Sequence, residues 1–472
     1  MKRINVAFKN YDKITMNATR KEEYLLGKKL VLLLILFLSG CAFHEQVTIA
    51  PSLLPYTTRE MKTAGFWIAQ HPSPDKVILN SEEIRNFNKH ITDELKLTKD
   101  ITQWEKGYPG DELRMNLEKT FKDFVEKNYY QSGAQRASSA FYKDVEKDSN
   151  FGAIPEQISV RYGFIVHYAD QRFFPTSQGL FAKQGDVDFD ELQNSGLDMG
   201  TPVAVLHQSL DGKWFYVETE LSGGWVESSH VALGNIGDVR EFLSQDPFVI
   251  IAKSKADIYL DLDMNNHYDY VRMGVRLPVD GKPVGERIPI RLPTAGENQK
   301  LIFKNAYLKR EDVSVGYLSY TPRTIIEQAF QLHNVPYGWG GMYGEQDCSR
   351  FLQEVFATVG IHFPRNSSEQ AKIGQALAKF DLTTSSEEKL QSLRRALRGA
   401  SILPLKGHIM LYLGEIEGRP FVIHATWGYR EPQGAGQVVR VLNRVVVSDL
   451  FLGKGSKKGS LLERLVAVVE VK

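Results

Sequence analysis

The sequence predicts a multidomain α+β protein, and three observations support this. The chain has 472 residues, which is more than one hydrophobic core normally holds together. Its pattern changes twice, from amphipathic helices to short alternating strands, and then to mixed helices and strands. A short apolar run near the start precedes all of these. The expected divisions of the chain are 1–40, 41–155, 156–240, 241–320 and 321–472.

The overall composition is that of an ordinary globular protein, with 42% hydrophobic and 24% charged residues. The net charge is +1 for the whole chain and −4 without residues 1–40. A nucleic-acid partner calls for a basic face, so none is expected. The acidic stretch that starts at Asp261 has Asn266 and Arg272 where a calcium-binding loop needs Gly and Glu. We therefore expect neither a metal ion nor a cofactor.

The first part of the chain has the pattern of an export signal. Residues 1–29 are polar and basic, and residues 30–38 form an apolar run that leads through Ser39 and Gly40 to Cys41. A bilayer span needs about 20 apolar residues, so this shorter run fits a signal peptide instead. The ending resembles a bacterial lipobox, and the resemblance implies that Cys41 carries a lipid anchor.

The lipobox resemblance also implies a location. Ala42 follows the cysteine, which in a two-membrane bacterium implies an exported protein anchored at the periplasmic side of the outer membrane. Cys41 and Cys348 are the only two cysteines, and we expect no disulfide between them, since an exported protein without spare thiols avoids wrong pairing. The start codon, Met1 or Met16, stays open.

Residues 41–155 are expected to form a helical packing domain. Asn80 and Glu83 have the spacing of a capping box at a helix start. Residues 111–130 carry apolar side chains at helical spacing. This part shows no spacing typical of a catalytic or metal site.

Residues 156–240 have the pattern of a small barrel. Asp211 and Gly212 form a hairpin turn signal between two predicted strands. The region resembles a bacterial SH3-type barrel at Gly200, Pro202, Val203, Trp214, Gly224, Trp225 and Val226. Residues 241–320 are expected to form a second barrel of this kind, on strand spacing alone.

The C-terminal region contains a candidate nucleophile. A Gly-rich loop at 336–341 leads to Cys348, and the apolar residues that follow at helical spacing end at Gly360. Cys348 is therefore expected in the first turn of a helix, where unpaired N–H groups and the helix dipole favour a thiolate. Asp347, directly before it, by itself disfavours a thiolate, which is tolerable if its carboxylate points at a cationic amine of the substrate.

Two histidines are candidates for the base. His408 begins one predicted strand and His424 ends the next, so a short hairpin brings them close. His408 is expected to act as base and general acid, and His424 to orient it. Tyr337 is expected to donate a hydrogen bond near the developing oxyanion. Residues 381–406 form a polar insertion before the His408 strand, and are expected to be either a lid or plain surface.

Several motifs together resemble the NlpC/p60 family of papain-like cell-wall cysteine peptidases. They are Tyr337-Gly338-Trp339-Gly340-Gly341, Asp347-Cys348-Ser349, Phe363-Pro364-Arg365-Asn366-Ser367 with Gln370, and Gly407-His408-Ile409 with Tyr412-Leu413-Gly414. The resemblance implies a papain-like α+β domain, preceded by two SH3-like β-barrels and a helical N-terminal domain. It implies hydrolysis of the γ-D-glutamyl–diamino acid bond in peptidoglycan stem peptides.

The resemblance also implies roles for individual residues. Cys348, His408 and His424 are the nucleophile, the base and the third catalytic residue. Asp347 is expected to receive the free amine of a terminal L-Ala. The remaining substrate-binding residues are expected to be Ser349 and Arg350, which would line the D-Glu pocket, together with Trp339. Arg350 departs from the family, because many members have Gly at that position. In the branch with this domain order, the first SH3 domain narrows the cleft and favours stems with a free N-terminal L-Ala.

Two alternatives stay open. The first is a non-catalytic cell-wall-binding lipoprotein, although a binding module needs neither Cys348 nor the two histidines. The second is an amidase or acyltransferase that uses the same Cys-His pair. The sequence leaves the preferred diamino acid and the oligomeric state undecided.

Overall fold

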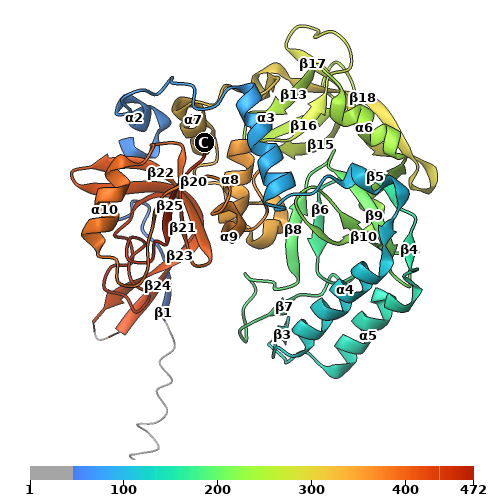
Figure 1. The fold of residues 1–472 in the computed structure, drawn as a ribbon, viewed down its shortest axis with the longest axis horizontal. Helices are drawn as coiled ribbons and strands as arrows, with labels where there is room; N and C mark the ends of the chain where they lie inside the picture. Colours follow the sequence, from blue (N-terminus) through green and yellow to red (C-terminus); the bar gives the residue numbers. More distant parts are fainter. Residues whose placement is uncertain (1–45, 133, 435) are drawn as a thin grey trace, which may run out of the picture.

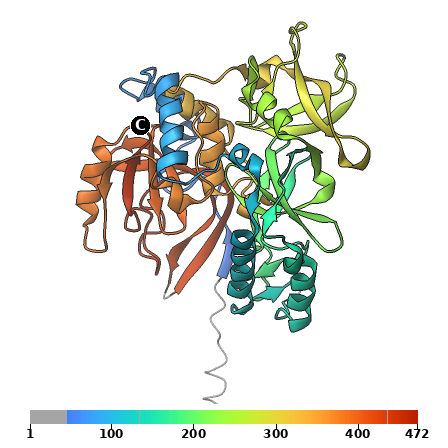
Figure 2. The same ribbon diagram turned by 45° about the vertical axis from the view of Figure 1, so that its right-hand side comes forward.

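The computed structural model describes residues 46–132, 134–434 and 436–472. The predicted signal peptide and the lipidation predicted at Cys41 lie outside the described residues. The C-terminal domain and two β-rich units lie side by side, and helix α8 lies between them (Figures 1 and 2). The multidomain α+β fold class is confirmed.

A seven-stranded sheet forms the C-terminal domain. Its strands, in spatial order, are β1 (Gln46–Ile49), β24 (Gly436–Asp449), β23 (Arg419–Gln433), β22 (His408–Ile416), β21 (Ser401–Leu405), β25 (Ala467–Glu470) and β20 (Gln375–Lys379). The three strands predicted around the histidines are present as β22, β23 and β24, antiparallel neighbours. Strand β1 was not predicted, and it adds to the edge of the sheet parallel to β24.

Helices cover both faces of this sheet. They are α7 (Pro322–Gln331), α8 (Cys348–Ala357) and α9 (Ser367–Gln370), and, within the insertion at 381–406, α10 (Ser386–Arg395). Successive residues of a strand point to opposite faces. Ile409 and Leu411 of β22 accordingly share a core with Phe351 of α8, whereas Met410 shares a second core with Leu393 of α10.

The insertion at 381–406 is not a lid. Its helix α10 packs on the face of the sheet opposite to α8, away from Cys348. Its last part, β21, is a buried strand between β22 and β25, with Ile402 and Leu403 fully buried. The apolar stretch at 402–405 therefore belongs to the sheet, and the interpretation of the whole insertion as polar was wrong.

The first β-rich unit is a seven-stranded sheet. Its strands, in spatial order, are β12 (Val231–Gly234), β5 (Arg161–Ile165), β9 (Pro202–Gln208), β10 (Trp214–Glu218), β11 (Gly223–Glu227), β6 (Ala169–Arg172) and β8 (Gln193–Leu197). The predicted turn joins β9 to β10, and Gly212 has the positive φ of +74° that such a turn needs. We call this unit barrel 1.

The second β-rich unit contains two small sheets and follows α6 (Ile236–Ser244). One sheet consists of β16 (Arg276–Pro278), β13 (Phe248–Ile251) and β19 (Val313–Val315), and the other of β15 (His267–Arg272), β14 (Lys255–Tyr259), β18 (Leu301–Lys309) and β17 (Arg287–Ala295). Val249 and Ile290 of this unit share a core with Phe164 and Trp225 of barrel 1. The all-strand prediction is confirmed, and the assignment as a second SH3 domain stays a prediction.

The segment before barrel 1 does not form a core of its own within the described residues. Its helices are α2 (Ala64–Ala69), α3 (Ser81–Lys89) with a π-helical continuation (His90–Glu94), α4 (Gly110–Val125) and α5 (Ser139–Ser149), and its short strands β2 (Tyr108–Pro109) and β3 (Tyr130–Gln131) pair with β4 (Gln157–Ile158) and β7 (Leu180–Phe181). Trp67 and Ile84 belong to the core between the sheet domain and its helices, whereas Leu113 and Leu117 share a core with the two β-rich units. The predicted helices are present, and α4 and α5 share a further core through Phe124 and Phe141. The assignment of 41–155 as one helical domain stays a prediction.

No helix in the described part of the chain is both long and apolar enough to cross a membrane. Within the same residues, no group of His, Cys, Asp and Glu side chains is placed to hold a metal ion.

Candidate active site

Cys348 is the first residue of α8, as the sequence predicts. Asp347 caps the helix, and its Oδ1 accepts a hydrogen bond of 2.8 Å from the backbone N–H of Arg350. The apolar stripe buries α8 against β22 and β23, and Phe351 and Val355 are fully buried. The turn after the helix ends at Gly360, where φ is +84°.

The thiol of Cys348 is protonated in the resting protein. Burial raises its pKa to about 12, and the neighbouring Asp347 carboxylate raises it further, against the backbone N–H groups of Ile409 and Ser349 and the Arg365 guanidinium. The backbone N–H of Ser349 at the helix start lowers the pKa of the thiol, as expected, but burial outweighs this effect. The expected effect of Asp347 on the thiol is confirmed.

The two predicted histidines lie together. His408 is the first residue of β22, and its Nε2 is 2.7 Å from Nδ1 of His424 on β23. His424 is buried, and its Nε2 is 3.1 Å from Oγ of Ser448 on β24. The hydrogen-bonded series His408–His424–Ser448 thus crosses three adjacent strands. Ser448 was missed, although it is a lone hydroxyl that follows a run of three valines in the sequence.

One tautomer of this series leaves a base free. If His408 donates its Nε2–H to Nδ1 of His424, then His424 donates its Nε2–H to Ser448, and Nδ1 of His408 carries no proton. Burial lowers the pKa of His408 to about 3, with Arg464 adding to the effect. Burial and His408 also hold the pKa of His424 well below its usual range. Both imidazoles are therefore neutral near neutral pH.

The histidine strand runs beside the cysteine helix. The backbone N–H of Ile409, the residue after His408, faces Sγ of Cys348. No hydrogen bond joins Cys348 directly to His408 in the described part of the chain. In unliganded enzymes the catalytic hydrogen bonds are often long and tighten when substrate binds.

Tyr337 lies in the electrostatic field of the same site. Burial raises the pKa of its hydroxyl well above the usual range, and Cys348 and Asp347 raise it further. The hydroxyl therefore keeps its proton and can donate a hydrogen bond. This agrees with the expected position of Tyr337 near the oxyanion.

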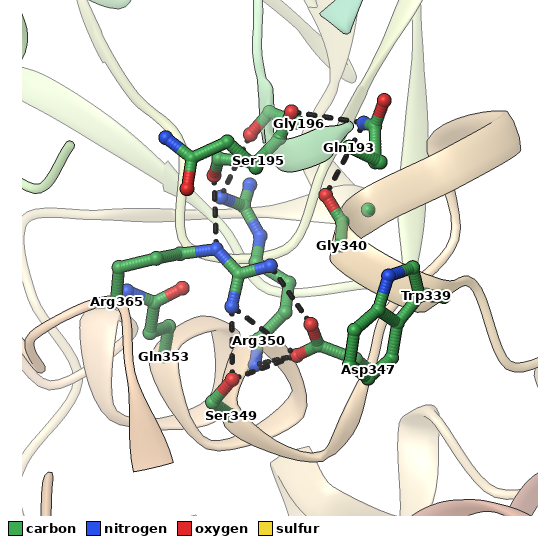
Figure 3. Close-up of polar contacts among 12 residues, drawn as sticks. Gln193, Ser195, Gly196, Trp339, Gly340, Asp347, Ser349, Arg350, Gln353 and Arg365 are labelled. Carbon is green, nitrogen blue, oxygen red and sulfur yellow. Dashed lines mark hydrogen bonds and ion pairs between the residues drawn. The ribbon is translucent and has the colours of Figure 1, made fainter. Parts of the chain in front are cut away.

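Asp347 already has a cationic partner within the chain. Arg365 places Nη2 2.8 Å from Oδ2 of Asp347 and Nη1 2.8 Å from Oγ of Ser349, which itself donates to Asp347 at 2.8 Å (Figure 3). Burial would raise the pKa of Asp347, but Arg365 outweighs it and holds that pKa below its usual range. From the sequence we expected substrate to supply this cation and gave Arg365 no role, although Arg365 stands in one of the family motifs.

Arg350 does not point into a pocket beside Cys348. Its guanidinium contacts Glu354 on α8 and Gly196 and Asp198 of barrel 1. The guanidinium donors of Arg350 are thus bound to other parts of the chain, and its expected role in the D-Glu pocket stays a prediction.

The Gly-rich loop before Cys348 packs closely on β8 of barrel 1. Gly340 and Gly341 have φ of +61° and +90°, and a Cβ on Gly341 would lie 2.6 Å from the backbone nitrogen of Gly196. Gln193 of β8 donates to the carbonyl of Gly340 at 3.3 Å (Figure 3). The glycines therefore serve a close contact between the loop and the barrel.

A loop of barrel 1 also contacts both sides of the site. Trp339 donates from Nε1 to the carbonyl of Asp190 at 3.0 Å. Phe189 lies edge-on to Trp339 at 5.3 Å and to Trp427 of β23 at 5.4 Å between ring centroids. Trp427 donates to Asp188 at 3.0 Å. Barrel 1 thus forms a wall that joins the cysteine side to the histidine side.

A separate cavity of about 410 Å³ lies where α8, barrel 1 and the second β-rich unit meet. Its lining includes Glu354 and His362 but none of Cys348, His408 and His424. The reactive groups therefore lie outside it, and we assign the candidate active site to Cys348 on chemical grounds.

A cysteine at the start of a helix, packed on an antiparallel sheet that carries two histidines, defines the papain-like α+β class. Residues 334–431 match the NlpC/P60 family, and residues 179–227 match an SH3 domain of the SH3b1 type. The chain carries an NlpC/P60 domain and a bacterial SH3 domain, as the motifs indicated.

Known proteins that are similar to this chain include a curated relative and a solved structure. The gamma-D-glutamyl-L-lysine dipeptidyl-peptidase of Bacillus subtilis (strain 168) is 31% identical over 83 residues, which are 17% of this chain and 28% of that protein. The match therefore spans less than a third of that relative. A solved structure described as a novel NlpC/P60 endopeptidase from Photobacterium damselae subsp. piscicida is 20% identical, with a TM-score of 0.73. The alignment covers 90% of this chain and 99% of that one, and the likeness concerns the fold.

Proposed function

We propose that this protein is a cysteine endopeptidase that hydrolyses the γ-D-glutamyl–diamino acid bond of peptidoglycan stem peptides. One observation carries the proposal: Cys348 begins a buried helix beside the strand whose His408 is hydrogen-bonded to His424. A nucleophile needs such a base, and the base needs an orienting partner. The name of the Bacillus subtilis relative supports the choice of bond.

The proposed reaction starts from a neutral thiol and a neutral imidazole. Nδ1 of His408 takes the proton of Cys348 as Sγ attacks the γ-carbonyl carbon of D-Glu. The oxyanion accepts hydrogen bonds from backbone N–H groups at the start of α8 and from the hydroxyl of Tyr337. His408 then protonates the leaving amine of the diamino acid. Water, deprotonated by His408, attacks the thioester, which releases the L-Ala-γ-D-Glu acid and restores the thiol.

We further propose that the enzyme prefers stems with a free N-terminal L-Ala. The contacts of barrel 1 with Trp339 and Trp427 support this, since they limit the room at one end of the site. The contacts of substrate with Asp347, Ser349 and Trp339 stay predictions. Asp347 and Ser349 would contribute to binding together with Arg365, which holds both.

We also propose that the protein is exported and held at the periplasmic side of the outer membrane by a lipid on Cys41. The support is the sequence of residues 1–42 alone. Fractionation of cells that express wild type and Cys41→Ser tests this. The wild type should stay with the membranes and Cys41→Ser should not, and equal fractionation of both would contradict it.

The direct test of function is digestion of purified L-Ala-γ-D-Glu-diamino acid peptide and of intact muropeptides. The proposal predicts L-Ala-γ-D-Glu and a shortened remainder with wild type, and no product with Cys348→Ala. Identical product profiles for both proteins would leave only the cell-wall-binding alternative. Cleavage between sugar and L-Ala, or a transfer product, would favour the amidase or acyltransferase alternative.

A further inference from the structure

Arg350, two residues after the nucleophile, joins the catalytic helix to barrel 1. Its Nε donates to Oε1 of Glu354, one turn further along α8, at 3.0 Å. Its Nη1 donates to the carbonyl of Gly196 at 3.2 Å, and its Nη2 pairs with Asp198. The side chains of Arg350 and Glu354 are 12% and 2% exposed, so the contacts are shielded from water. Figure 3 shows Arg350 reaching from the helix toward Gly196.

Asp198 is held from a third direction as well. Arg272, the last residue of β15 in the second β-rich unit, places Nε 2.8 Å from Oδ1 and Nη2 3.2 Å from Oδ2 of Asp198. Arg272 is 1% exposed, and its Nη1 lies 3.8 Å from Oε1 of Glu354. Arg350, Asp198, Arg272 and Glu354 therefore form a buried group of two guanidinium and two carboxyl groups. We call it the junction cluster.

The two carboxyl groups of the junction cluster differ, because burial raises the pKa of Glu354 whereas the pKa of Asp198 is lowered. Burial would raise the pKa of Asp198, but Arg272 and Arg350 outweigh burial and hold that pKa below its usual range. Buried ion pairs add little net stability, but they fix geometry when every charge has its partner. The four members come from three parts of the chain, namely α8, barrel 1 and the second β-rich unit, so the cluster fixes the relative positions of those parts.

The junction cluster fixes the position of barrel 1, and barrel 1 borders the active site. Strand β8 leads from Gln193, which contacts the Gly-rich loop, through Ser195, whose Oγ is 3.0 Å from Nε of Arg365, to the chain just before Asp198. The same barrel contributes the wall against Trp339 and Trp427. A shift of barrel 1 away from α8 would therefore widen the site next to Cys348.

We propose that Arg350 is a positioning residue: through the junction cluster it holds barrel 1 against the start of α8 and so determines which stem peptides enter the site. This inference rests on the proposed function and gives Arg350 a role other than binding D-Glu. The cluster acts through barrel 1 and does not touch the reacting atoms.

The test is the ratio of kcat/KM for two substrates, L-Ala-γ-D-Glu-diamino acid with a free amine and the same peptide acetylated on L-Ala. A ratio does not depend on the fraction of folded enzyme, so a merely structural loss does not move it. We expect wild type to prefer the free amine by about tenfold or more. In Arg350→Met/Asp198→Asn the ratio should fall by about tenfold, mainly through KM.

The double variant is chosen because it removes one cation and one carboxylate together and leaves Glu354 as the remaining carboxyl partner of Arg272, at 3.8 Å. The single variant Arg350→Lys, with Asp198 intact, keeps the positive charge but loses the paired contacts of the guanidinium. Its ratio should lie between that of the double variant and that of wild type. The matched control is Arg323→Met, which breaks the exposed pair of Arg323 Nε with Asp75 Oδ1 at 2.6 Å and should leave the ratio unchanged.

Three outcomes would overturn the inference. A folded double variant with the wild-type ratio shows that the junction cluster does not control entry. An equal fall in Arg323→Met shows that the effect is not specific to the cluster. A wild type that cleaves neither peptide overturns the proposed function itself, and the inference with it.

Discussion

Arg365 contacts both residues that flank Cys348 and a serine of barrel 1. It sets the charge balance beside the thiol, because it offsets the Asp347 carboxylate. The reactivity of the site therefore depends on three neighbouring ionisable groups, Cys348, Asp347 and Arg365.

Replacing these charges should move the reactivity of the thiol in opposite directions. Arg365→Gln leaves Asp347 unbalanced, which raises the thiol pKa, whereas Asp347→Asn removes a cause of the raised pKa and lowers it. The rate of alkylation by iodoacetamide, measured against pH in a Cys41→Ser background, reports on Cys348 alone. Its midpoint should move to higher pH in the first variant and to lower pH in the second.

The exposed Arg394→Gln on α10 serves as the control and should keep the wild-type midpoint. Arg365→Gln should also lose stability by about 3–5 kcal/mol, because a buried carboxylate loses its partner. A shift in the same direction in Arg365→Gln and Asp347→Asn would contradict this explanation of the thiol pKa.

Ser448 should matter to catalysis although it is far from Cys348 in sequence. Ser448→Ala removes the partner of His424 Nε2 and loosens the orientation of His408. A neutral hydrogen bond contributes about 0.5–1.5 kcal/mol, so kcat should fall about two- to tenfold. Ser401→Ala is a matched control, because Ser401 is also fully buried and its Oγ has no partner among the residues described. Equal kcat values for the two variants would exclude the role of Ser448.

At the scale of single elements, the helix and strands around the site were predictable from local patterns. Helical spacing after Cys348 predicted α8, and two apolar runs predicted the β22–β23 hairpin with His408 at the start of its strand. His424 was expected at the end of its strand, but it lies within β23, which continues to Gln433. A hydrogen-bond partner could not be predicted where it depends on which strands lie next to each other in the sheet. Ser448 reaches His424 only because β24 pairs with β23, and β21 was missed because its apolar stretch follows a polar helix.

The Gly-rich loop should be intolerant of a side chain because of barrel 1. Gly341→Ala combines left-handed backbone strain of about 1–2 kcal/mol with a clash against Gly196 that adds about 1–3 kcal/mol. Gly185→Ala isolates the strain, because Gly185 has φ of +75° and a Cβ added there would meet open space. Thermal unfolding should show the larger loss for Gly341→Ala, and equal losses would contradict the close contact.

At the scale of the whole molecule, segments far apart in sequence are brought together in two ways. The N-terminal helices divide between the sheet domain and the barrels, and the junction cluster joins three parts of the chain. Sequence patterns show which face of an element is apolar but not which neighbour covers it. Arg350 illustrates this, since its motif position suggested a pocket and its contacts lie on barrel 1.

The buried neutral histidines should make stability depend on pH. Burial lowers the pKa of His408 to about 3 and that of His333 to about 4, and also lowers that of His424. Their imidazoles take up protons in the unfolded chain but not in the folded one as pH falls below about 6.5. The stability that depends on these neutral histidines is therefore fully present above that pH. Below it, the free energy of unfolding falls by about 1.4 kcal/mol per pH unit for each such histidine.

Urea unfolding of wild type and His424→Gln at about pH 7.5 and about pH 5.5 measures this dependence. The variant should lose less stability on acidification, and His90→Gln, at a partly exposed position, should behave like wild type. His362 opposes the trend, because Glu220 raises its pKa. A variant as sensitive to acid as wild type would contradict the assignment of a neutral buried His424.

The central claim is that Cys348 forms a thioester with the γ-carbonyl of D-Glu. The most direct test is mass spectrometry of the protein quenched in acid during turnover of L-Ala-γ-D-Glu-diamino acid peptide. We expect an L-Ala-γ-D-Glu acyl group on the peptide that contains Cys348, and neither adduct nor product with Cys348→Ala. Product formation by Cys348→Ala, or wild-type turnover with the acyl group on another residue, would contradict it.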